Sequence, residues 1–538
     1  AGSYEIIVQG MLENSISEPA DQFGFALTSG DYNADGFDDL VVGVPYENLG
    51  AATDCGAVMA LFGSAQGLDP VQSEFFSQTS LFESINESND LFGWAVASGD
   101  FNRDGFDDLV VGAPLEDFPN VTDTGMIGVF FGSRDGFLPA RTEVISQESI
   151  SDAFNEDGDR FGRSLAVGDF DGDGYDDVAV GVPYEDGGNV SDIGMVMVLF
   201  GSGAGLVTNT EVSSEVFSQA SLEGSTSETG DRFGWALAAG DFDSDGNDDL
   251  AVGIPYEDID SDQGAGMVGV FYGSSSGLLP ADSESFDQTD VGRGRNSRND
   301  NAGYSLAVGD VDGDGFEDLL VGVISDNYAG TLNNGSIMAV FGSADGIAPE
   351  RGVFLGQSMF GGEEESGDEF GTVVAIGDFD ADGIAEMVVG AEKEDLDGGI
   401  VEGGAVYVGT LADSDGDGLT DLAESDVFET DPMKADTDGD GIDDGEERFA
   451  GTDPLDAGSL VRINSVEVST FTSQVTLSFQ SVPERLYRIE RSPVLSGAPW
   501  VDLTGGFPVF AFGAETVVFD SNVPAGTKRL FYRVVALP

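Results

Sequence analysis

A nine-residue acidic loop that recurs six times is the feature that most constrains this chain. Its third copy reads "DFDGDGYDD", from Asp169 to Asp177, and the apolar run "VAVGV" follows at once. Carboxylates this close repel one another, and each raises the pKa of its neighbours. Because the run that follows must be buried, the repulsion needs a counter-charge beside it. The pattern therefore predicts a cation within each loop.

The spacing of the acids indicates which cation. Oxygen ligands at positions 1, 3, 5 and 9, a carbonyl at position 7 and a glycine at position 6 are typical of a Ca²⁺ loop. An EF-hand would also need a glutamate at position 12, where this loop has Val180. The loop is therefore expected to join two strands. With oxygen ligands alone, zinc and copper are disfavoured.

The six copies begin 68 to 72 residues apart, and each supplies one predicted ligand set at positions 1, 3, 5 and 9. Asparagine at position 3 removes one negative charge from the first two sets, so we expect these to bind calcium more weakly. The predicted ligands are Asp31, Asn33, Asp35 and Asp39; Asp100, Asn102, Asp104 and Asp108; Asp169, Asp171, Asp173 and Asp177; Asp241, Asp243, Asp245 and Asp249; Asp310, Asp312, Asp314 and Asp318; and Asp378, Asp380, Asp382 and Glu386.

Each repeat holds four short apolar segments separated by turn residues. A Phe-Gly pair, replaced by "AG" in the fifth repeat, precedes the loop, and a Gly-x-Pro follows the second segment in the first four repeats. A fourth segment carries a glutamine, as at Gln78. Four strands per unit at a fixed period predict an all-β fold, a six-bladed β-propeller. A parallel solenoid is the alternative, but the unit is too long for one.

The two ends of the repeat region predict how the ring closes. The N-terminal "EIIVQG", with Gln9, matches the fourth segment of a repeat, while the last repeat ends at "GAVYVGT" without a fourth segment. We therefore expect the N-terminal strand to complete the last blade.

Together, the Phe-Gly pair, the calcium loop and the Gly-x-Pro resemble the FG-GAP repeat of integrin alpha subunits. The resemblance covers roughly residues 1–410. It implies a propeller with structural Ca²⁺ between the first and second strands of each blade, and partners bound mainly on the opposite face. Integrin propellers have seven blades, whereas six repeats are present here.

Residues 411–459 carry two further acidic loops, "DSDGDGLTDLAE" and "DTDGDGIDDGEE". Position 12 is now a glutamate, as a full calcium loop requires. The segment resembles bacterial thrombospondin type 3 repeats, and a flexible acidic linker is the alternative. The predicted ligands are Asp413, Asp415, Asp417, Asp421 and Glu424, then Asp436, Asp438, Asp440, Asp444 and Glu447.

Residues 460–538 alternate apolar and polar positions, which predicts a small β-sandwich. It resembles C-terminal β-domains of secreted bacterial proteins. From Val461 onward seven basic and six acidic residues give a net charge of +1. The remainder of the chain therefore carries −82, and the two together give the formal net charge of −81. This polarity between a near-neutral end and an acidic remainder is the main signal outside the repeats.

Composition excludes several functions. Nucleic acid and anionic membranes are disfavoured, because 101 acidic residues face only 20 basic ones. No histidine is present, and the single cysteine, Cys55, has no partner for a disulfide. Among so many carboxylates, a glycosidase-like pair arises by chance, and Glu47, Glu116, Glu185 and Glu257 recur with the repeat as structural acids would. Trp94 and Trp235 fit packing between blades better than stacking on sugars.

These observations predict a non-catalytic, secreted or cell-surface protein with about eight Ca²⁺ ions, working in adhesion or as a structural module. The first residue, Ala1, fits a chain released from a signal peptide, and the surplus acidity fits a bacterium in a saline environment. A protein or glycan at the cell surface or matrix is the expected partner, with head-to-tail self-association through residues 460–538. Two alternatives remain open for that domain, which are anchoring to a cell and folding back on its own propeller. The alternative function is a lectin or polysaccharide lyase that uses the propeller face.

Overall fold

The computed structural model describes residues 7–12, 17–70, 73–82, 84–138, 141–150, 155–208, 211–291, 295–379, 385–395 and 403–412, parts of 414–455, and the strands between 463 and 537. The chain divides into two compact units. The first holds residues 1–309, 316–377 and 387–409, and the second holds 310–315, 378–386 and 410–538.

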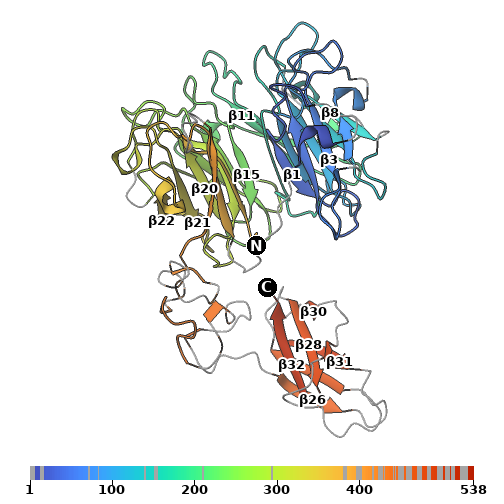
Figure 1. Cartoon of the computed structure of the whole chain (residues 1–538), viewed down its shortest axis with the longest axis vertical. Coiled ribbons are helices and arrows are strands. Elements are labelled where there is room, and N and C mark those ends of the chain that lie inside the picture. The colour runs from blue at the N-terminus through green and yellow to red at the C-terminus, as the bar shows by residue number, and fades with distance from the viewer. Residues whose placement is uncertain are drawn as a thin grey trace. The chain divides into compact units, whose positions relative to one another are not determined.

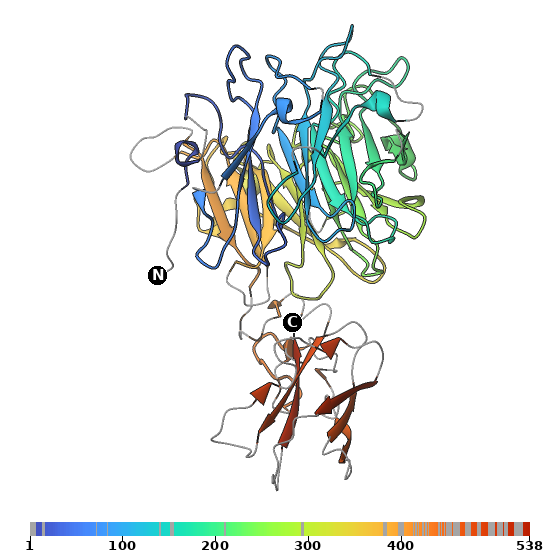
Figure 2. The same ribbon diagram turned by 90° about the vertical axis from the view of Figure 1, so that its right-hand side faces the viewer.

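The first unit is a six-bladed β-propeller, as the repeats predict, and the blades follow one another in chain order (Figure 1 and Figure 2). Blades one to three are β1 (Leu27–Gly30), β2 (Asp39–Val44), β3 (Ala57–Leu61) and β4 (Ser73–Phe76); β5 (Ala95–Gly99), β6 (Asp108–Ala113), β7 (Met126–Phe130) and β8 (Thr142–Ile145); and β9 (Ser164–Gly168), β10 (Asp177–Val182), β11 (Met195–Leu199) and β14 (Ser214–Phe217). A two-stranded hairpin, β12 (Val207–Thr208) and β13 (Glu211–Val212), precedes β14.

Blades four and five have the same antiparallel meander, and blade six has three described strands. They are β15 (Leu237–Gly240), β16 (Asp249–Ile254), β17 (Met267–Tyr272) and β18 (Leu279–Phe286); β19 (Ala302–Gly309), β20 (Asp318–Val323), β21 (Ser336–Phe341) and β22 (Ala348–Leu355); and β23 (Phe370–Gly377), β24 (Glu386–Ala391) and β25 (Ala405–Gly409).

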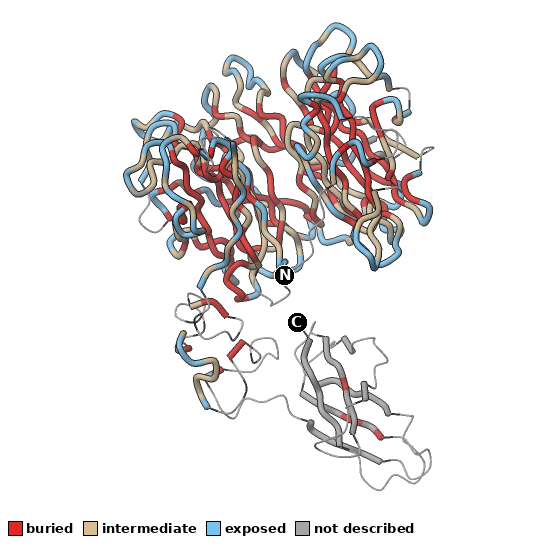
Figure 3. The backbone as a smooth tube through the Cα atoms, in the orientation of Figure 1, coloured by how far each residue is buried: buried red, intermediate tan, exposed pale blue. Residues whose placement is uncertain are grey.

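The first strand of each blade lies innermost. In order, β1 packs on β5, β5 on β9, β9 on β15, β15 on β19 and β19 on β23, so these strands surround the propeller axis. In blades one to five the second and third strands are enclosed between neighbouring blades, and all six residues of β10 are buried. Figure 3 shows this burial running through the strands, with exposed residues in the loops at their ends.

Two of the sequence motifs meet at the junctions between blades. A Cβ on Gly181, the glycine of a Gly-x-Pro, would lie 2.3 Å from the carbonyl oxygen of Gly234, the glycine of the next Phe-Gly pair. Four other junctions repeat this contact, so a side chain at either glycine would separate the blades. The repeats are Gly43 with Gly93, Gly112 with Gly162, Gly253 with Gly303 and Gly322 with Gly371.

The sixth junction is built differently. A Cβ on Gly390 would meet the side chain of Val373 at 2.6 Å, and one on Gly24 would meet nothing within 4 Å. Val373 stands where the other repeats have alanine or serine. Val373 is 59% exposed, and Val406 and Val408 of the same blade are 67% and 55% exposed. The last blade therefore presents an apolar face where the other five blades are covered.

A repeated glutamine clasp links each fourth segment to the following blade. Gln78, in the turn η3 (Gln78–Ser80), donates its side-chain amide to Glu116 of the next blade. Gln147, in η4 (Gln147–Ser149), donates to Glu185 at 2.7 Å, and Gln357, in η7 (Gln357–Phe360), donates to Glu394. The recurring glutamates predicted to be structural therefore serve to join blades.

The fourth and fifth junctions modify this clasp. Gln219, in η5 (Gln219–Ser221), donates to Ser225 Oγ at 3.4 Å. Gln288 donates instead to Asp300 at 3.1 Å, because the fifth repeat has the shorter Asp326 in place of the glutamate. A further turn in that repeat, η6 (Tyr328–Gly330), follows Asp326.

The N-terminal segment repeats the clasp. Gln9, in η1 (Gln9–Met11), donates to Glu47 of the first blade at 2.6 Å, across the same 38 residues that separate Gln78 from Glu116. Leu12 then packs on the first blade with Val42 and Met59. Gln9 therefore occupies the place of a fourth segment that precedes blade one. The strand pairing expected to complete the last blade falls largely on residues 1–6, outside the described residues.

The second unit ends in two antiparallel sheets, in agreement with the all-β prediction. One sheet is β26 (Ile463–Val468), β27 (Val475–Gln480) and β31 (Glu515–Asp520). The other is built around β28 (Leu486–Ser492), which pairs with β29 (Val501–Asp502), β30 (Val509–Phe510) and β32 (Phe531–Leu537). Leu477 and Ile489 are fully buried, one from each sheet.

The clasp predicts how stability depends on pH. Burial, and then the charge of Asp90, raise the pKa of Glu116 from 4.5 to about 8. Between these values the unfolded chain ionises at this position while the folded chain does not, so stability falls as pH rises through the window. We expect Glu116→Gln to raise the melting temperature at pH 8 and to leave it unchanged at pH 4, in saturating calcium.

Calorimetry across this pH range checks the prediction. Glu148→Gln, at an exposed glutamate in the next turn, is the matched control and should leave the melting temperature unchanged throughout. A pH profile of Glu116→Gln parallel to that of the parent protein would contradict the assignment.

Candidate metal centres

Each predicted loop lies between the first and second strands of its blade, at the end of the propeller opposite the Phe-Gly pairs. In the third blade the loop leaves β9 at Gly168 and enters β10 at Asp177. The turn depends on glycine at position 6, where Gly174 has φ +84° and the other described copies are similar. Backbone amides from the turn bind the first ligand, as when Gly174 donates to Asp169 Oδ2 at 2.8 Å.

The structure brings the position 1, 3 and 9 carboxylates together in three blades. In each of these loops one oxygen from each carboxylate lies within 4.8 Å of the others. The groups are Asp169, Asp171 and Asp177; Asp241, Asp243 and Asp249; and Asp310, Asp312 and Asp318. Three converging carboxylates with no basic residue among them form a donor set suited to a hard cation such as Ca²⁺.

Position 5 lies outside these groups. Asp173 instead accepts a hydrogen bond from the backbone amide of Tyr175 at 3.0 Å, which closes the turn. Asp35, Asp104 and Asp245 make the equivalent bond to Phe37, Phe106 and Asn247. This side chain therefore shapes the loop.

Position 9 carries the buried charge of each site. Asp177 Oδ1 accepts from Gly201 at 2.8 Å, after the third strand, and Oδ2 accepts from Phe170 at 3.0 Å. Burial, and then the charges of other acids in each loop, raise the pKa of Asp108, Asp177 and Asp249 to about 8. A cation is the counter-charge that keeps such carboxylates ionised at neutral pH.

The first, second and sixth loops vary this arrangement. Asn102 donates its amide to Asp108 Oδ2 at 2.8 Å, and Asn33 reaches Asp39 at 3.4 Å. In the sixth loop Glu386 accepts from Phe379 at 2.7 Å, the bond that aspartate makes elsewhere. Asp378 lies among the described residues, whereas Asp380 and Asp382 lie outside them.

Sequence reasoning missed the acid at position 8, which joins one calcium loop to the next. Asp176 Oδ2 accepts the backbone N–H of Asp100, the first ligand of the preceding blade, at 2.7 Å. Three other junctions repeat this bond: Asp107 to Asp31, Asp248 to Asp169 and Glu317 to Asp241. The signal in the sequence was the pair of acids at positions 8 and 9. The acid at position 8 bonds to the neighbouring blade, and the acid at position 9 bonds within its own blade.

The sixth repeat lacks this latch. Its position 8 is Ala385, whose backbone N–H reaches the Asp310 carbonyl at 3.4 Å and which has no carboxylate to offer. The junction between the fifth and sixth loops therefore holds one fewer side-chain bond than the four before it.

In the second unit, the two linker loops interlock. Asp417 and Glu424 of the first predicted set converge with Asp444 of the second, within 4.8 Å of one another. Asp444 is fully buried, and its Oδ1 accepts from Thr437 at 2.9 Å. The linker ligands were expected as two separate sets, but Asp444 lies with the first. Glu447 is also fully buried. Asp413, Asp415 and Asp440 lie outside the described residues.

Two other predicted linker ligands bond within their own loops. Asp421 accepts from Ser414 N and Oγ, both at 2.8 Å, and Asp436 accepts from Gly439 at 2.7 Å. Asp438 has a buried Oδ2. Within the second unit Thr420 donates to the Asp312 carbonyl at 3.0 Å.

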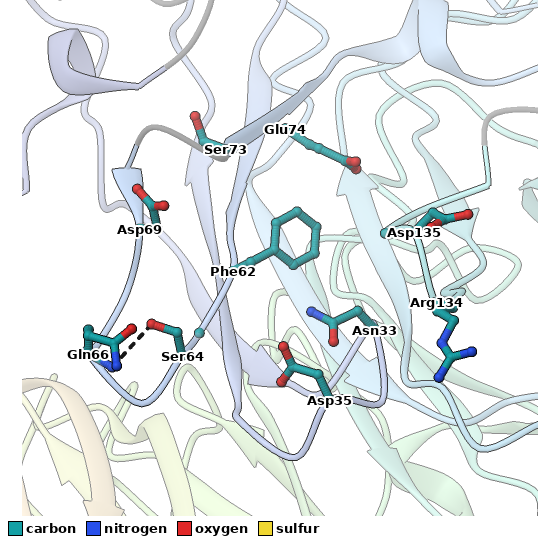
Figure 4. A pocket seen from close by; sticks show the side chains of 12 residues that line it. Asn33, Asp35, Phe62, Ser64, Gln66, Asp69, Ser73, Glu74, Arg134 and Asp135 are labelled. Carbon is teal, nitrogen blue, oxygen red and sulfur yellow. Dashed lines mark hydrogen bonds between the residues drawn. The ribbon is translucent and has the colours of Figure 1, made fainter.

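An open pocket lies beside the first acidic loop, between the ends of blades one and two (Figure 4). Asn33 and Asp35 line it from the loop, Phe62 and Glu74 from blade one, and Arg134 from blade two. Burial raises the pKa of Glu74. The lining thus combines several carboxylates with one cation, Arg134.

Comparison with known families identifies both repeat types. The FG-GAP repeat matches residues 23–58, 92–130, 161–199, 233–271, 302–332 and 370–408. The bacterial TSP3 repeat matches residues 413–435 and 436–457. The resemblance of the propeller to FG-GAP repeats and of the linker to thrombospondin type 3 repeats is confirmed.

Curated relatives include integrins and a phospholipase. Integrin alpha-PS2 of Drosophila melanogaster is 32% identical over 279 residues, which are 50% of this chain and 18% of that protein. Integrin alpha pat-2 of Caenorhabditis elegans is 30% identical over 271 residues, 48% of this chain and 20% of that protein. Phosphatidylinositol-glycan-specific phospholipase D of Rattus norvegicus is 35% identical over 181 residues, 34% of this chain and 20% of that protein. The chain thus spans about a fifth of these relatives.

The loop geometry predicts opposite effects for two substitutions. Asn102→Asp adds a carboxylate beside Asp108, so we expect it to destabilise the calcium-free protein and to tighten calcium binding. Asp171→Asn removes one charge from a three-carboxylate group and should do the reverse. Melting temperatures in calcium and in chelator measure both effects, and the difference between them should widen for Asn102→Asp and narrow for Asp171→Asn.

The parent protein supplies the reference for this comparison. Chelation should lower its melting temperature markedly, since clustered carboxylates lose their counter-charge. Equal melting in calcium and in chelator would show that the loops hold no stabilising metal.

Proposed function

We propose that this chain is an extracellular, calcium-stabilised, non-catalytic protein with an adhesion or structural role. The observation that carries the proposal is the convergence of loop carboxylates at one end of an integrin-like propeller, continued by acidic TSP3 repeats. Such sites fill at extracellular calcium concentrations, which favours a secreted or surface location. Among the described residues, the structure contains no helix long and apolar enough to cross a membrane.

The proposal assigns about eight Ca²⁺ ions to the chain, one for each propeller loop and two for the linker. It also assigns three parts, the propeller over residues 1–410, the calcium-binding linker over 411–459 and the β-sandwich over 460–538. A saline bacterial habitat accounts for the acidity that calcium leaves uncompensated. Eight ions offset 16 of the 81 net negative charges, and salt screens the remainder.

The proposed assembly is head to tail. Residues 461–538 carry a formal charge of +1, while the rest of the chain carries −82. Attraction between unlike surfaces of two copies orients their encounter, and a contact between different surfaces continues into a ring or filament. A propeller stiffened by calcium and a near-neutral terminal domain supply the two surfaces.

Truncation after Ser459 tests the assembly. We expect the full chain in calcium to gain mass with concentration by light scattering, and the truncated chain to remain monomeric. Circular dichroism and calcium-dependent melting serve as controls that the propeller is intact in both. If both chains are monomers across all concentrations, the assembly proposal fails while the calcium-stabilised propeller stands.

A further inference from the structure

A cluster of arginine and aromatic side chains surrounds the propeller axis at the end opposite the acidic loops. Its core consists of the residues that follow the Phe-Gly pairs, because these begin the innermost strands. They are Phe25, Trp94, Arg163, Trp235 and Tyr304, from blades one to five. Sequence reasoning assigned Trp94 and Trp235 to packing between blades, and this is where the structure places them.

The side chains form a continuous stack from blade to blade. Phe25 lies 4.5 Å from Trp94 between ring centroids, and Arg163 lies over Trp94 at 4.9 Å and over Trp235 at 4.4 Å. Trp235 in turn lies 5.5 Å from Tyr304. Cation–π contacts of this kind are favourable but leave the N–H groups of a guanidinium free for other partners.

Two further arginines extend the cluster outward. Arg232 lies over Tyr184 at 4.7 Å and over Tyr256 at 4.5 Å, and Arg160 lies over Tyr184 at 4.2 Å. The Nε atoms of Arg160 and Arg232 are buried and have no hydrogen-bond partner. Both residues occupy the position before the phenylalanine of a Phe-Gly pair.

The informative feature is that, in a chain with 101 acidic residues, these arginines form no ion pair with the described residues. The groups around Arg163 are tyrosines and Arg160, and burial among them lowers the pKa of Arg163. Nearby acids such as Glu185 instead bind the glutamine clasps.

We infer that this cluster, Arg160, Arg163 and Arg232 with their aromatic neighbours, binds a sugar acid, a pyranose that carries a carboxylate. Guanidinium groups without an acidic partner bind a carboxylate through paired hydrogen bonds. Partly exposed aromatic rings with polar tips, among them Trp94 and Tyr304, suit the alternating apolar and hydroxyl surface of a sugar ring. The site does not depend on the head-to-tail assembly.

The chain's net charge limits the form of this ligand. A charge of −81 opposes the approach of a long polyanion, while a single carboxylate at the end of a glycan meets mainly the local field of three arginines. Physiological or higher salt screens the wider repulsion and leaves close contacts largely intact.

The test compares two matched ligands on the full chain in calcium, with about 0.5 M salt to screen the net charge. We expect methyl glucuronide to bind saturably by saturation-transfer NMR and calorimetry, and methyl glucoside, which lacks the carboxylate, to bind at least tenfold more weakly. Arg160→Gln and Arg232→Gln should each weaken glucuronide binding about tenfold. Arg160 contacts one ring, so its loss is the gentler change to the fold, and the melting temperature verifies folding.

The chain supplies a matched control. Arg141 also lies over an aromatic ring, Phe131, at 3.9 Å, but it is on the acidic-loop side and pairs with Asp104. Arg141→Gln should leave glucuronide binding unchanged. The inference is overturned if glucuronide does not bind, if glucoside binds as well, or if Arg141→Gln weakens binding as much as the other variants. Equal binding of N-acetylglutamate amide would overturn the sugar and assign the site to acidic peptides.

Discussion

The fold depends on placing negative charge next to buried strands. Every blade delivers a carboxylate at position 9 into the region where the second strand enters the core. Backbone amides anchor it, and in the first, third and fourth blades these amides come from two neighbouring turns. Those amides fix the position of the charge but do not neutralise it. The second strands can therefore pack stably only if these charges are neutralised, and a divalent cation in each loop neutralises them.

The clasp glutamates of the same repeat favour the protonated form, unlike loop carboxylates that bind a cation. The clasp glutamates, such as Glu116, lie between blades beside a second carboxylate, and burial favours their protonated form. The calcium loops need ionised carboxylates, whereas burial at the clasps favours protonated ones more than the bond from the glutamine favours the ionised form. One repeat thus carries two sets of acids that respond to pH in opposite directions, and the metal determines which response dominates.

Much of this arrangement was readable from the sequence, because each strongly constrained position recurs. The ligand spacing, the position 6 glycine and the four-strand period all follow from local rules, and the structure confirms the propeller they predict. The match of Gln9 to the glutamine of a fourth segment could be predicted for the same reason. Contacts that depend on register between blades were not readable: the latch formed by Asp176, the meeting of Gly181 with Gly234 and the convergence of Asp444 with Asp417 each require knowing which residues the fold brings together. The arginine cluster also escaped prediction, since Arg163 is a departure from the repeat.

The sixth blade is held to its neighbours by fewer of the repeated contacts than the other five blades are. Five junctions are tied by backbone contact between glycines, and four of them by an acidic latch as well. Val373 replaces the first kind of tie where blade six would meet blade one, and Ala385 removes the second kind between the fifth and sixth loops. Under tension, blades that are joined by fewer contacts separate before blades that are joined by more. A pull on the propeller would therefore separate the sixth blade from its neighbours while the first five blades stay joined.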